Sequence, residues 1–502
     1  MLIKTETDQI QSYLGDSSHL TGGFAERVVY PESVEEVSPV LADASRTRSP
    51  ITVSGAGTGT VAGRVPFGGT VIATDKLNRI GTVVRDQEGG HVTAEAGVVL
   101  SDLQRAVDSE GLLYPPDPTE RSCFIGGNIA TNASGSRTFK YGPTRNYVER
   151  LKVVLATGDI IDLRRGELLA GPSGTVVIPL SSGQTIAAQL PTYRMPHVRK
   201  HASGYHVAPG MDVIDLFIGS EGTLGVIVEA ELGLLPKPQG LLSGVVFFAD
   251  ETNLLSFVSE ARARSLKTRE VSPTVREGSS LDARALEFFD VESLNFLRHK
   301  YDAVPTDAAG AIFFEQETTP STEDSLMNDW LVLLADHHAL ADQSWFAVNE
   351  QDQIKLREFR HALPVLMNEW FARYQQRKVS TDMAVPDEAF AEMLRFYQEA
   401  LRGGDLRYTI FGHIGDNHVH VNILPRDDRE AEKAWTIYRT FIHRAVEVGG
   451  TISAEHGIGK LKREYLRELY GDEHLREMAE LKRAFDPAGI LGRGNMFGEE
   501  LL

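Results

Sequence analysis

The first half of the chain alternates short apolar runs with glycine-rich turns. Between residues 27 and 160, the runs ITVSGAGTGT, GTVIATD, HVTAEAGV and ERLKVVLATGDII have the β-branched content and the length of strands. Two segments show helical periodicity instead, one near Pro31 to Ser45 and one over about Leu100 to Glu110. The pattern predicts a sheet-rich N-terminal region with few helices.

The pattern changes after the tripeptide PKP at Pro236–Pro238, a composition typical of a domain boundary. Before it, residues 163–200 show little periodicity and predict a loop-rich insertion. Beyond it, strands such as VVFFAD and AGAIFFEQE alternate with long helices, including one around Gln351 to Gln376. Two further helices are predicted near residues 427–447 and 458–485. We therefore predict an α+β fold, divided into residues 1–237, 238–457 and 458–502.

Composition narrows the class of protein. The 502 residues are 42% hydrophobic and 24% charged, as in soluble globular proteins of two or three domains. The net charge is −19, and no block of lysine and arginine interrupts it, which argues against nucleic-acid binding. There is no apolar run of eighteen residues and no signal-peptide pattern at the start. We expect a cytoplasmic protein without a membrane span, which leaves peripheral membrane association open.

Three glycine-rich loops are candidates for cofactor binding. The first, SGAGTGTVAG at Ser54–Gly63, precedes RVPFGG, in which Pro66 excludes the helix that a dinucleotide-binding fingerprint requires. The sequence therefore predicts strand, loop and strand, with consecutive amides forming a phosphate nest; a simple β-turn is the alternative for this loop alone. The loops at Pro115–Gly135 and Gly219–Ile227 have few bulky side chains, as a backbone lying against a flat ring requires.

The order and spacing of these loops, with the flanking PESVEEVSPVLADA and TFKYGPTRNYV, resemble the FAD-binding half of the vanillyl-alcohol oxidase flavoproteins. The resemblance implies a two-part FAD-binding domain of the PCMH type, in which residues 458–502 pack back on residues 1–237. An α+β substrate (cap) domain would lie between them. Residues that the resemblance places at the pyrophosphate, the flavin or the adenosine side are Ala56, Gly57, Thr58, Gly59, Ser122, Gly126, Gly127, Asn132, Gly222, Ile227 and Asn495.

The histidine and cysteine content of the chain bears on FAD attachment and on redox chemistry. This flavoprotein family sometimes tethers FAD through histidine, but the loop at Pro115–Gly135 contains none. We therefore expect FAD to be held without a covalent bond. The single cysteine, Cys123, would be a small packing residue beside the flavin loop rather than a redox thiol. It also excludes a cysteine-ligated cluster carried by this chain.

Two polar segments carry the remaining chemistry. In GHIGDNHVHVN (Gly412–Asn422), strand alternation places His418, His420 and Asn422 on one face, and a hairpin turn at GD brings His413 opposite His420. His413 and His420 could then share a metal ion, with Glu455 of SAEHGIG (Ser453–Gly459) as the oxygen ligand. The alternative is a buried, hydrogen-bonded histidine cluster, and His418 taken singly is better explained as structural.

These segments, with the tail LKRAFDPAGILGRGNMF, resemble the C-terminal half of the FAD-dependent D-2-hydroxyacid dehydrogenases. That group includes D-lactate dehydrogenases, D-2-hydroxyglutarate dehydrogenases and the glycolate oxidase large subunit. Roles implied by the motifs are metal ligands at His413, His420 and Glu455, the catalytic base at His456, and substrate binding at Arg360 (in LREFRHALP) and Asn422. Ser380 and the pair Asn417–His418 depart from the pattern of the hydroxyglutarate enzymes. These departures weaken the case for D-2-hydroxyglutarate as the substrate.

The resemblance implies oxidation of a D-2-hydroxy acid, D-lactate or a longer analogue, to the 2-oxo acid. Arginine would anchor the carboxylate, histidine would take the hydroxyl proton, and hydride would pass to the flavin. One divalent metal, zinc in preference to manganese or iron, would acidify the hydroxyl. Because the chain has no cysteines for a cluster, we expect electrons to pass to a quinone, an electron-transfer flavoprotein or an iron–sulfur protein.

Three other functions are compatible with parts of this pattern. A non-haem iron oxygenase also uses two histidines and a carboxylate, but it would leave the glycine loops unexplained. A non-redox flavoprotein of the same fold, such as the alkyl-ether-lipid synthase, would keep those loops. A non-catalytic binding subunit would have no need of the complete set formed by the two histidines, Glu455 and His456.

Overall fold

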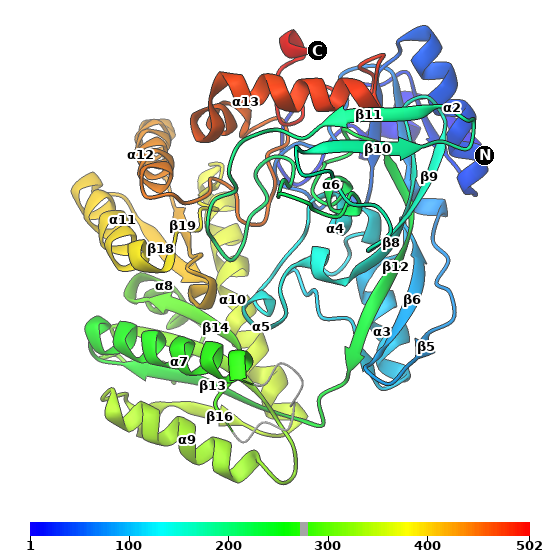
Figure 1. Ribbon diagram of the computed structural model, residues 1–502. Coiled ribbons are helices and arrows are strands. Elements are labelled where there is room, and N and C mark those ends of the chain that lie inside the picture. Colours follow the sequence, from blue (N-terminus) through cyan, green and yellow to red (C-terminus); the bar gives the residue numbers. More distant parts are fainter. Residues whose placement is uncertain (272–279) are drawn as a thin grey trace.

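The computed structural model describes residues 1–271 and 280–502. Two large sheets, one of six strands and one of seven, stand side by side in it, each covered by helices (Figure 1). The N-terminal strands and the C-terminal helix lie together at one end, and the middle of the chain forms the other end (Figure 1). Within the described residues, no helix has the length and apolar content needed to cross a bilayer.

The first sheet is small and mostly parallel. Its strand order is β1-β2-β4-β3, and β4 pairs in parallel with both β2 and β3. The strands are β1 (Leu2–Lys4), β2 (Arg27–Tyr30), β3 (Ile51–Ser54) and β4 (Thr70–Ala73). Helix α2 (Val34–Thr47) packs its apolar face, including Val37 and Leu41, against them. No helix lies between β3 and β4, so the predicted strand, loop and strand are confirmed for the first glycine loop.

The second sheet is antiparallel and centres on the long strand β12. The strands are β5 (Val84–Arg85), β6 (Gly90–Glu95), β7 (Leu112–Leu113), β8 (Val148–Val154), β9 (Ile160–Arg164) and β12 (Val226–Pro236). Helix α3 (Leu100–Ser109) confirms the second predicted helix. The loop predicted at Pro115–Gly135 is wrong in its middle, because α4 (Ile125–Ala130) forms there and buries Ile125 and Ile129.

The predicted loop-rich insertion contains a hairpin of its own. Strands β10 (Thr175–Pro179) and β11 (Thr185–Gln189) pair with each other and with no other strand among the described residues. The hairpin lies beside α13 (Arg463–Phe485) (Figure 1). The segment after it leads through residues 190–213 to the short helix α6 (Ile214–Phe217). This segment reaches the candidate site, as described below.

The remaining strands form an antiparallel seven-stranded sheet of order β16-β13-β15-β14-β18-β19-β17. The strands are β13 (Gly240–Phe248), β14 (Ala283–Asp290), β15 (Gly310–Thr318), β16 (Trp345–Ala347), β17 (Val379–Ser380), β18 (Tyr408–Gly412) and β19 (His420–Ile423). The chain crosses from the second sheet to this one between β12 and β13, after Pro236 (Figure 1). The division into three domains stays a prediction.

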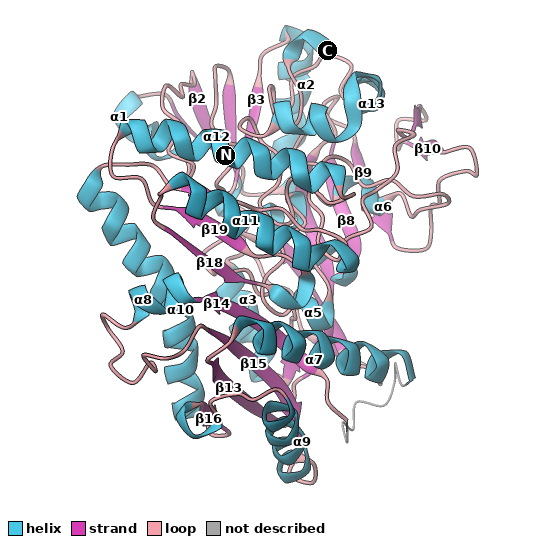
Figure 2. Ribbon diagram, turned by 90° about the vertical axis from the view of Figure 1, so that its left-hand side faces the viewer, coloured by secondary structure: helices cyan, strands magenta, loops and turns pink. Residues whose placement is uncertain are grey.

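Helices cover both faces of the seven-stranded sheet (Figure 2). On β13, Val246 and Phe248 belong to one apolar core, and Val245 and Phe247 belong to the other. The helices on the first core are α7 (Glu251–Val271), α9 (Glu323–Asp336), α11 (Phe390–Gly404) and α12 (Asp428–Glu447), and those on the second are α8 (Val291–Leu297) and α10 (Glu350–Tyr374). Alternate residues are therefore buried on opposite faces.

The C-terminal segment returns to the first sheet. Ile51 of β3 donates its backbone N–H to the Ile490 carbonyl (2.8 Å), so a strand from the N-terminal region pairs with the tail. The helix predicted from about residue 458 begins later, at Arg463. Gly457 and Gly459 have φ values of +79° and +50°, which interrupt a right-handed helix. The segment that carries Glu455 and His456 is therefore a tight loop.

Candidate active site

The antiparallel pair β18–β19 brings the histidines together. Phe411 lies opposite His420 in the register, and the turn between the strands closes at Asn417, which has a φ of +52°. His413 consequently faces His420, with their ring centroids 5.5 Å apart. One ligand atom from each of four residues lies within 4.8 Å of the others: His413, His418, His420 and Glu455. Sequence reasoning included three of these four and gave His418 a structural role.

The geometry of this cluster fits a divalent cation. Glu455 lies between two histidines, with Oε1 3.3 Å from His413 Nε2 and Oε2 3.9 Å from His420 Nε2. The opposite nitrogens are engaged elsewhere: Nδ1 of His413 lies 2.6 Å from Glu287 Oε1, and Nδ1 of His420 lies 3.0 Å from the Thr381 carbonyl. Such partners orient metal-binding imidazoles, leaving both Nε2 atoms directed at the centre.

Charge is concentrated in this buried cluster. Burial lowers the pKa of His413, but Glu287 and Glu455 outweigh that effect and raise it to about 9. The pKa of His420 is held well below its usual value by burial and by the neighbouring histidines. Burial raises the pKa of Glu455, but His413 and Lys200 outweigh it and hold it well below the usual range. The cluster thus combines the carboxylate of Glu455, the neutral imidazole of His420 and the protonated imidazole of His413. These groups suit a cation that displaces the proton of His413.

Lys200 supports Glu455 from a distant part of the chain. Its side chain is fully buried, and Nζ donates to Glu455 Oε1 (2.6 Å) and to the Gly135 carbonyl (2.8 Å). Ser134 donates a further hydrogen bond to Glu455 (3.1 Å). Sequence reasoning missed Lys200 because it lies at the end of the loop-rich insertion, 255 residues from its partner. A buried ammonium fixes the carboxylate and compensates its charge.

Asp382 organises the loop of Glu455 and His456. It is fully buried, and its carboxylate accepts the backbone N–H groups of Glu455 (3.2 Å) and His456 (3.1 Å). It also accepts from Lys462 Nζ (2.7 Å) and lies 3.3 Å from His456 Nδ1. Its other oxygen lies 3.2 Å from His418 Nε2. One carboxylate therefore fixes the loop backbone and two histidine rings. Sequence reasoning gave it no role.

His456 lies where the cation cluster meets a second cavity. Its ring is stacked against that of His420, with centroids 5.7 Å apart, and it lines a cavity built by the glycine loops. Burial lowers the pKa of His456, although Asp382 opposes that effect. The ring is therefore an acceptor near neutral pH. With Nδ1 near Asp382, its Nε2 is the atom left for chemistry.

The glycine-loop cavity brings together most of the residues assigned to FAD. Those that line it are Ala56, Gly57, Thr58, Gly59, Gly126, Gly127, Gly222 and Ile227. A Cβ atom built on Gly59 or Gly127 would meet nothing within 4 Å, so both residues border open space. A cradle of backbone amides beside open space fits the pyrophosphate and a flat ring system. Cys123 also lines the cavity, and burial raises its pKa to about 11, which fits a packing residue.

Three residues assigned to FAD lie outside that lining. Ser122 is exposed and hydrogen-bonds Glu120, and Asn132 accepts the Arg145 backbone N–H (3.0 Å). Asn495 donates to the carbonyls of Gly63 (2.9 Å) and Glu221 (3.2 Å). Asn495 therefore hydrogen-bonds to both the first and the third glycine loops, although it does not line the cavity itself.

Glu221 connects the third glycine loop with the loop that carries Glu455 and His456. Its carboxylate accepts the backbone N–H groups of Ile458 and Gly459, both at 2.7 Å. It lines the same cavity as His456 and has a φ of +53°. The contact spans 237 residues, so no local pattern indicates it. It holds the loop of His456 against the cavity wall.

The two residues assigned to substrate have different surroundings. Arg360 donates Nε and Nη2 to Glu287 Oε2 (3.0 and 2.8 Å), and its Nη1 lies 2.7 Å from His361 Nε2. Glu287 thus links Arg360 to His413, and those two cations hold the pKa of Glu287 far below its usual value despite burial. Asn422 is fully buried, and its Oδ1 has no hydrogen-bond partner within residues 1–271 and 280–502.

Comparison with known proteins places this chain in a family. Residues 25–164 match the FAD binding domain family, and residues 267–496 match the family of FAD linked oxidases, C-terminal domain. Glycolate oxidase subunit GlcD of Bacillus subtilis (strain 168) is 31% identical over 494 residues, covering 97% of this chain and 92% of that protein. The chain belongs to the FAD-linked D-2-hydroxyacid dehydrogenase family.

Other members of the FAD-linked D-2-hydroxyacid dehydrogenase family are equally well covered. The D-lactate dehydrogenase of Anaerostipes hadrus is 32% identical over 94% of this chain and 89% of that protein. The D-2-hydroxyglutarate dehydrogenase of Stutzerimonas stutzeri (strain A1501) is 28% identical over 99% of this chain and 96% of that protein. This dehydrogenase family member therefore has relatives named for three different hydroxy acids.

The fold extends beyond these dehydrogenases. A solved alkyldihydroxyacetonephosphate synthase has a TM-score of 0.65 and 15% identity, covering 98% of this chain and 81% of that one. At this identity the likeness concerns the fold alone. The predicted fold class, an FAD-binding domain of the PCMH type with a mixed α and β second domain, is confirmed for this FAD-linked dehydrogenase family member.

Proposed function

We propose that this protein oxidises a D-2-hydroxy acid, D-lactate or a longer analogue, to the 2-oxo acid with FAD and one divalent cation. The observation that carries the proposal is the position of His456, which lines the glycine-loop cavity and stacks on His420 of the cation cluster. A base shared by a cofactor cavity and a cation site suits removal of a hydroxyl proton beside a hydride acceptor.

The residues divide the work between holding and proton transfer. When bound, the cation would lower the pKa of the substrate hydroxyl and FAD would accept hydride from the α-carbon. Nε2 of His456 takes the hydroxyl proton, and the carboxylate of Asp382 at Nδ1 stabilises the imidazolium that results. Lys200 keeps Glu455 charged and in place. Glu221 holds the loop that carries His456 against the cavity.

Arg360 is our proposed anchor for the substrate carboxylate. Glu287 binds one edge of its guanidinium, while the edge at Nη1 faces His361 in a small pocket. An arginine that is oriented by a carboxylate on one edge and lines a pocket with the other is pre-organised for a carboxylate. Asn422 would add a hydrogen bond near His420, because its Oδ1 has no partner among the described residues.

The donor set is compatible with zinc, manganese or iron, and we favour zinc. Two imidazoles and a carboxylate form a borderline set that zinc tolerates with an open position for substrate. His418 is a fourth candidate ligand by its distance from the others. A separate quinone, electron-transfer flavoprotein or iron–sulfur protein would take the electrons, because the chain has one cysteine and it is buried.

Anaerobic bleaching of the flavin is expected with D-2-hydroxy acids and not with their L-enantiomers. The purified yellow protein would be mixed with D- and L-lactate and with longer D- and L-2-hydroxy acids, and the flavin absorbance followed. The acid that bleaches fastest identifies the substrate class. Bleaching by L-enantiomers alone contradicts the assignment, and a flavin that no acid bleaches favours non-redox chemistry on this fold. A colourless protein favours the non-haem iron alternative.

Acid precipitation is expected to release the yellow colour into the supernatant. The loop at Pro115–Gly135 offers backbone amides and no histidine to which FAD could be tethered. The absorbance of the supernatant and of the dissolved pellet would be compared after precipitation. Colour that stays with the pellet contradicts non-covalent binding.

A further inference from the structure

A pocket rich in arginine lies where the chain crosses from β12 to β13. It has a volume of about 750 Å³ and is bordered by α3, β13 and α10. Six of its lining residues are cationic: Arg105, Arg121, Arg137, Lys237, Arg284 and Arg357. Two are acidic, Asp108 and Glu350. This excess of positive charge opposes the net charge of −19 on the whole chain.

Three of the arginines share two carboxylates, Asp117 and Glu315. Arg121 and Arg137 pair with Asp117 at 2.9 and 3.1 Å. Arg284 pairs with Glu315 at 2.7 Å, and Arg137 lies 3.6 Å from the same carboxylate. The side chains of Arg137 and Arg284 are only 14% and 7% exposed, so solvent screens them weakly. The two carboxylates do not neutralise the combined positive charge of Arg121, Arg137, Arg284 and Arg357.

Arg357 is the unpaired member. Among residues 1–271 and 280–502 it has no hydrogen bond or ion pair, although it is partly buried on α10. Burial lowers its pKa, Glu315 opposes this, and Arg137, Arg284 and Arg121 lower it further. A guanidinium in this position lacks the partner that a desolvated charge requires. An anion in the pocket would supply it.

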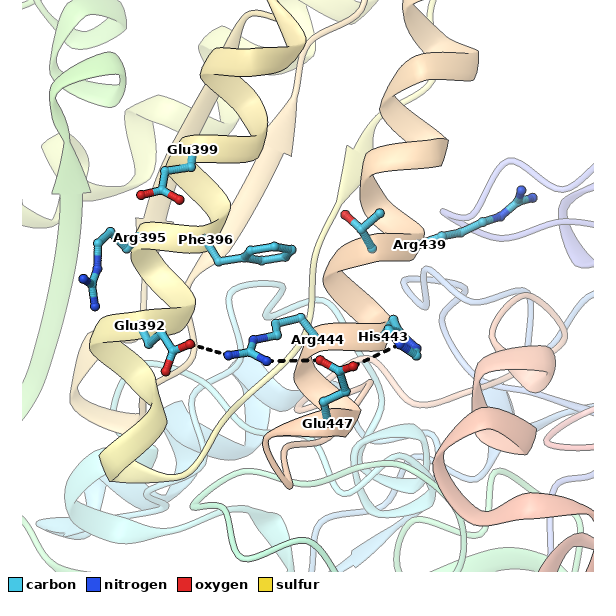
Figure 3. Close-up of a pocket in the computed structure, with 9 residues that line it drawn as sticks. Glu392, Arg395, Phe396, Glu399, Arg439, His443, Arg444 and Glu447 are labelled. Carbon is cyan, nitrogen blue, oxygen red and sulfur yellow. Dashed lines mark hydrogen bonds and ion pairs between the residues drawn. The ribbon is translucent and has the colours of Figure 1, made fainter.

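The groove between α11 and α12 is a useful contrast (Figure 3). Arg444 pairs there with Glu392 and Glu447, and His443 lies beside Glu447 (Figure 3). Arg395 and Glu399 also line it. Positive and negative groups balance there, so that groove has no electrostatic need for an anion. The arginine-rich pocket differs in this respect.

A second, smaller pocket extends the first toward the active site. It shares Arg121, Arg137 and Arg357 with the larger pocket and adds Arg360 and His361. Arg360 is bound to Glu287, which contacts His413 of the cation cluster. The two pockets therefore share a wall of arginines, and the smaller one contains Arg360, the proposed anchor of the substrate carboxylate.

We propose that the arginine-rich pocket binds an oxyanion of the carboxylate or phosphate class, with Arg357 as its primary ligand. Guanidinium groups present paired N–H donors that match such anions. The anion has two sources of the same chemistry. It is either the distal group of a longer 2-hydroxy acid, which rests on the proposed function, or a separate small anion, which does not.

Binding of inorganic phosphate to the FAD-loaded protein tests the proposal without turnover. Calorimetric titration would use phosphate, with chloride at matched ionic strength as the reference. The variants are Arg357→Gln and, as a matched control, Arg395→Gln in the groove of Figure 3. Loading with FAD beforehand occupies the glycine-loop nest, so that phosphate cannot bind there.

Phosphate is expected to bind the wild type and Arg395→Gln equally, and Arg357→Gln at least about tenfold more weakly, the usual worth of a charge-assisted hydrogen bond. Without phosphate, Arg357→Gln should be as thermally stable as the wild type or more so, because it removes repulsion. Absence of binding to the wild type overturns the proposal. Binding that survives in Arg357→Gln belongs to another site and overturns it too.

Steady-state kinetics distinguishes the two sources of the anion. D-lactate and D-2-hydroxyglutarate would be compared with and without phosphate. If phosphate raises the KM of the diacid and not that of D-lactate, the pocket receives the distal group of the substrate. If phosphate changes neither KM, or the diacid is not oxidised, the ligand is a separate anion. Because phosphate binding is measured without substrate, failure of the proposed oxidation would leave that result unaffected.

Discussion

Replacing His456 with glutamine is expected to lower turnover by about 10²–10⁴-fold, the usual worth of a positioned general base. Metal content should stay unchanged, because the cation cluster consists of His413, His418, His420 and Glu455, and His456 lies beside it. FAD content should also stay unchanged. The deficit should shrink as the pH rises, where the hydroxyl loses its proton to solvent more readily. Turnover, metal analysis and the flavin spectrum of the purified variant measure these effects.

Glu455→Gln is the informative companion to this variant. If Glu455 is a metal ligand, its replacement should loosen or remove the metal, and excess metal should restore part of the activity. His443→Gln, on the exposed side of α12, controls for loss of a histidine elsewhere. Metal lost from His456→Gln and kept by Glu455→Gln would show that the two roles are reversed.

Replacing Asp382 with asparagine is expected to produce the second large effect, a loss of turnover of about 10²–10⁴-fold together with lower stability. The carboxylate fixes the His456 ring and the loop backbone, so its loss frees the base. It also leaves the buried ammonium of Lys462 without its partner, which costs about 3–5 kcal/mol of unfolding free energy. Turnover and urea denaturation measure the two consequences separately.

Asp290→Asn is the matched control for Asp382. Asp290, the last residue of β14, is a buried carboxylate that accepts the backbone N–H groups of Ser293 and Ile410. Asparagine keeps an oxygen for those bonds, so turnover should stay within a few-fold of the wild type. If Asp382→Asn loses stability but retains turnover, Asp382 supports the fold and does not position His456.

The sequence predicted those parts of the site that lie within short segments. The strand pattern around residues 408–423 predicts a hairpin that brings His413 close to His420. β18 and β19 form that hairpin, with Phe411 opposite His420 in the register and the His413 and His420 rings 5.5 Å apart. Pro66 excluded a helix after the first glycine loop, and none is present. Local sterics and strand periodicity decide both features, so a single sequence contains the information.

The supporting residues were beyond that kind of reasoning. Lys200, Glu221 and Glu287 reach their partners across 255, 237 and 126 residues. Nothing in the local sequence distinguishes them from surface charges, because their burial depends on how separate sheets pack. The late start of α13 had a local cause, since two glycines adopt positive φ values, but a glycine pattern alone does not specify φ.

The pairing of Ile51 with Ile490 has a consequence for biosynthesis. β3 lies at the edge of its sheet, and its neighbour on the open side is supplied about 440 residues later. At about 5–20 residues per second, the ribosome would need roughly 20–90 s to deliver that neighbour. Throughout this time the emerging chain exposes an unpaired strand next to the first glycine loop, which invites pairing with another nascent chain. Slow translation would thus increase aggregation of this protein, and a chaperone that shields the nascent N-terminal region would reduce it.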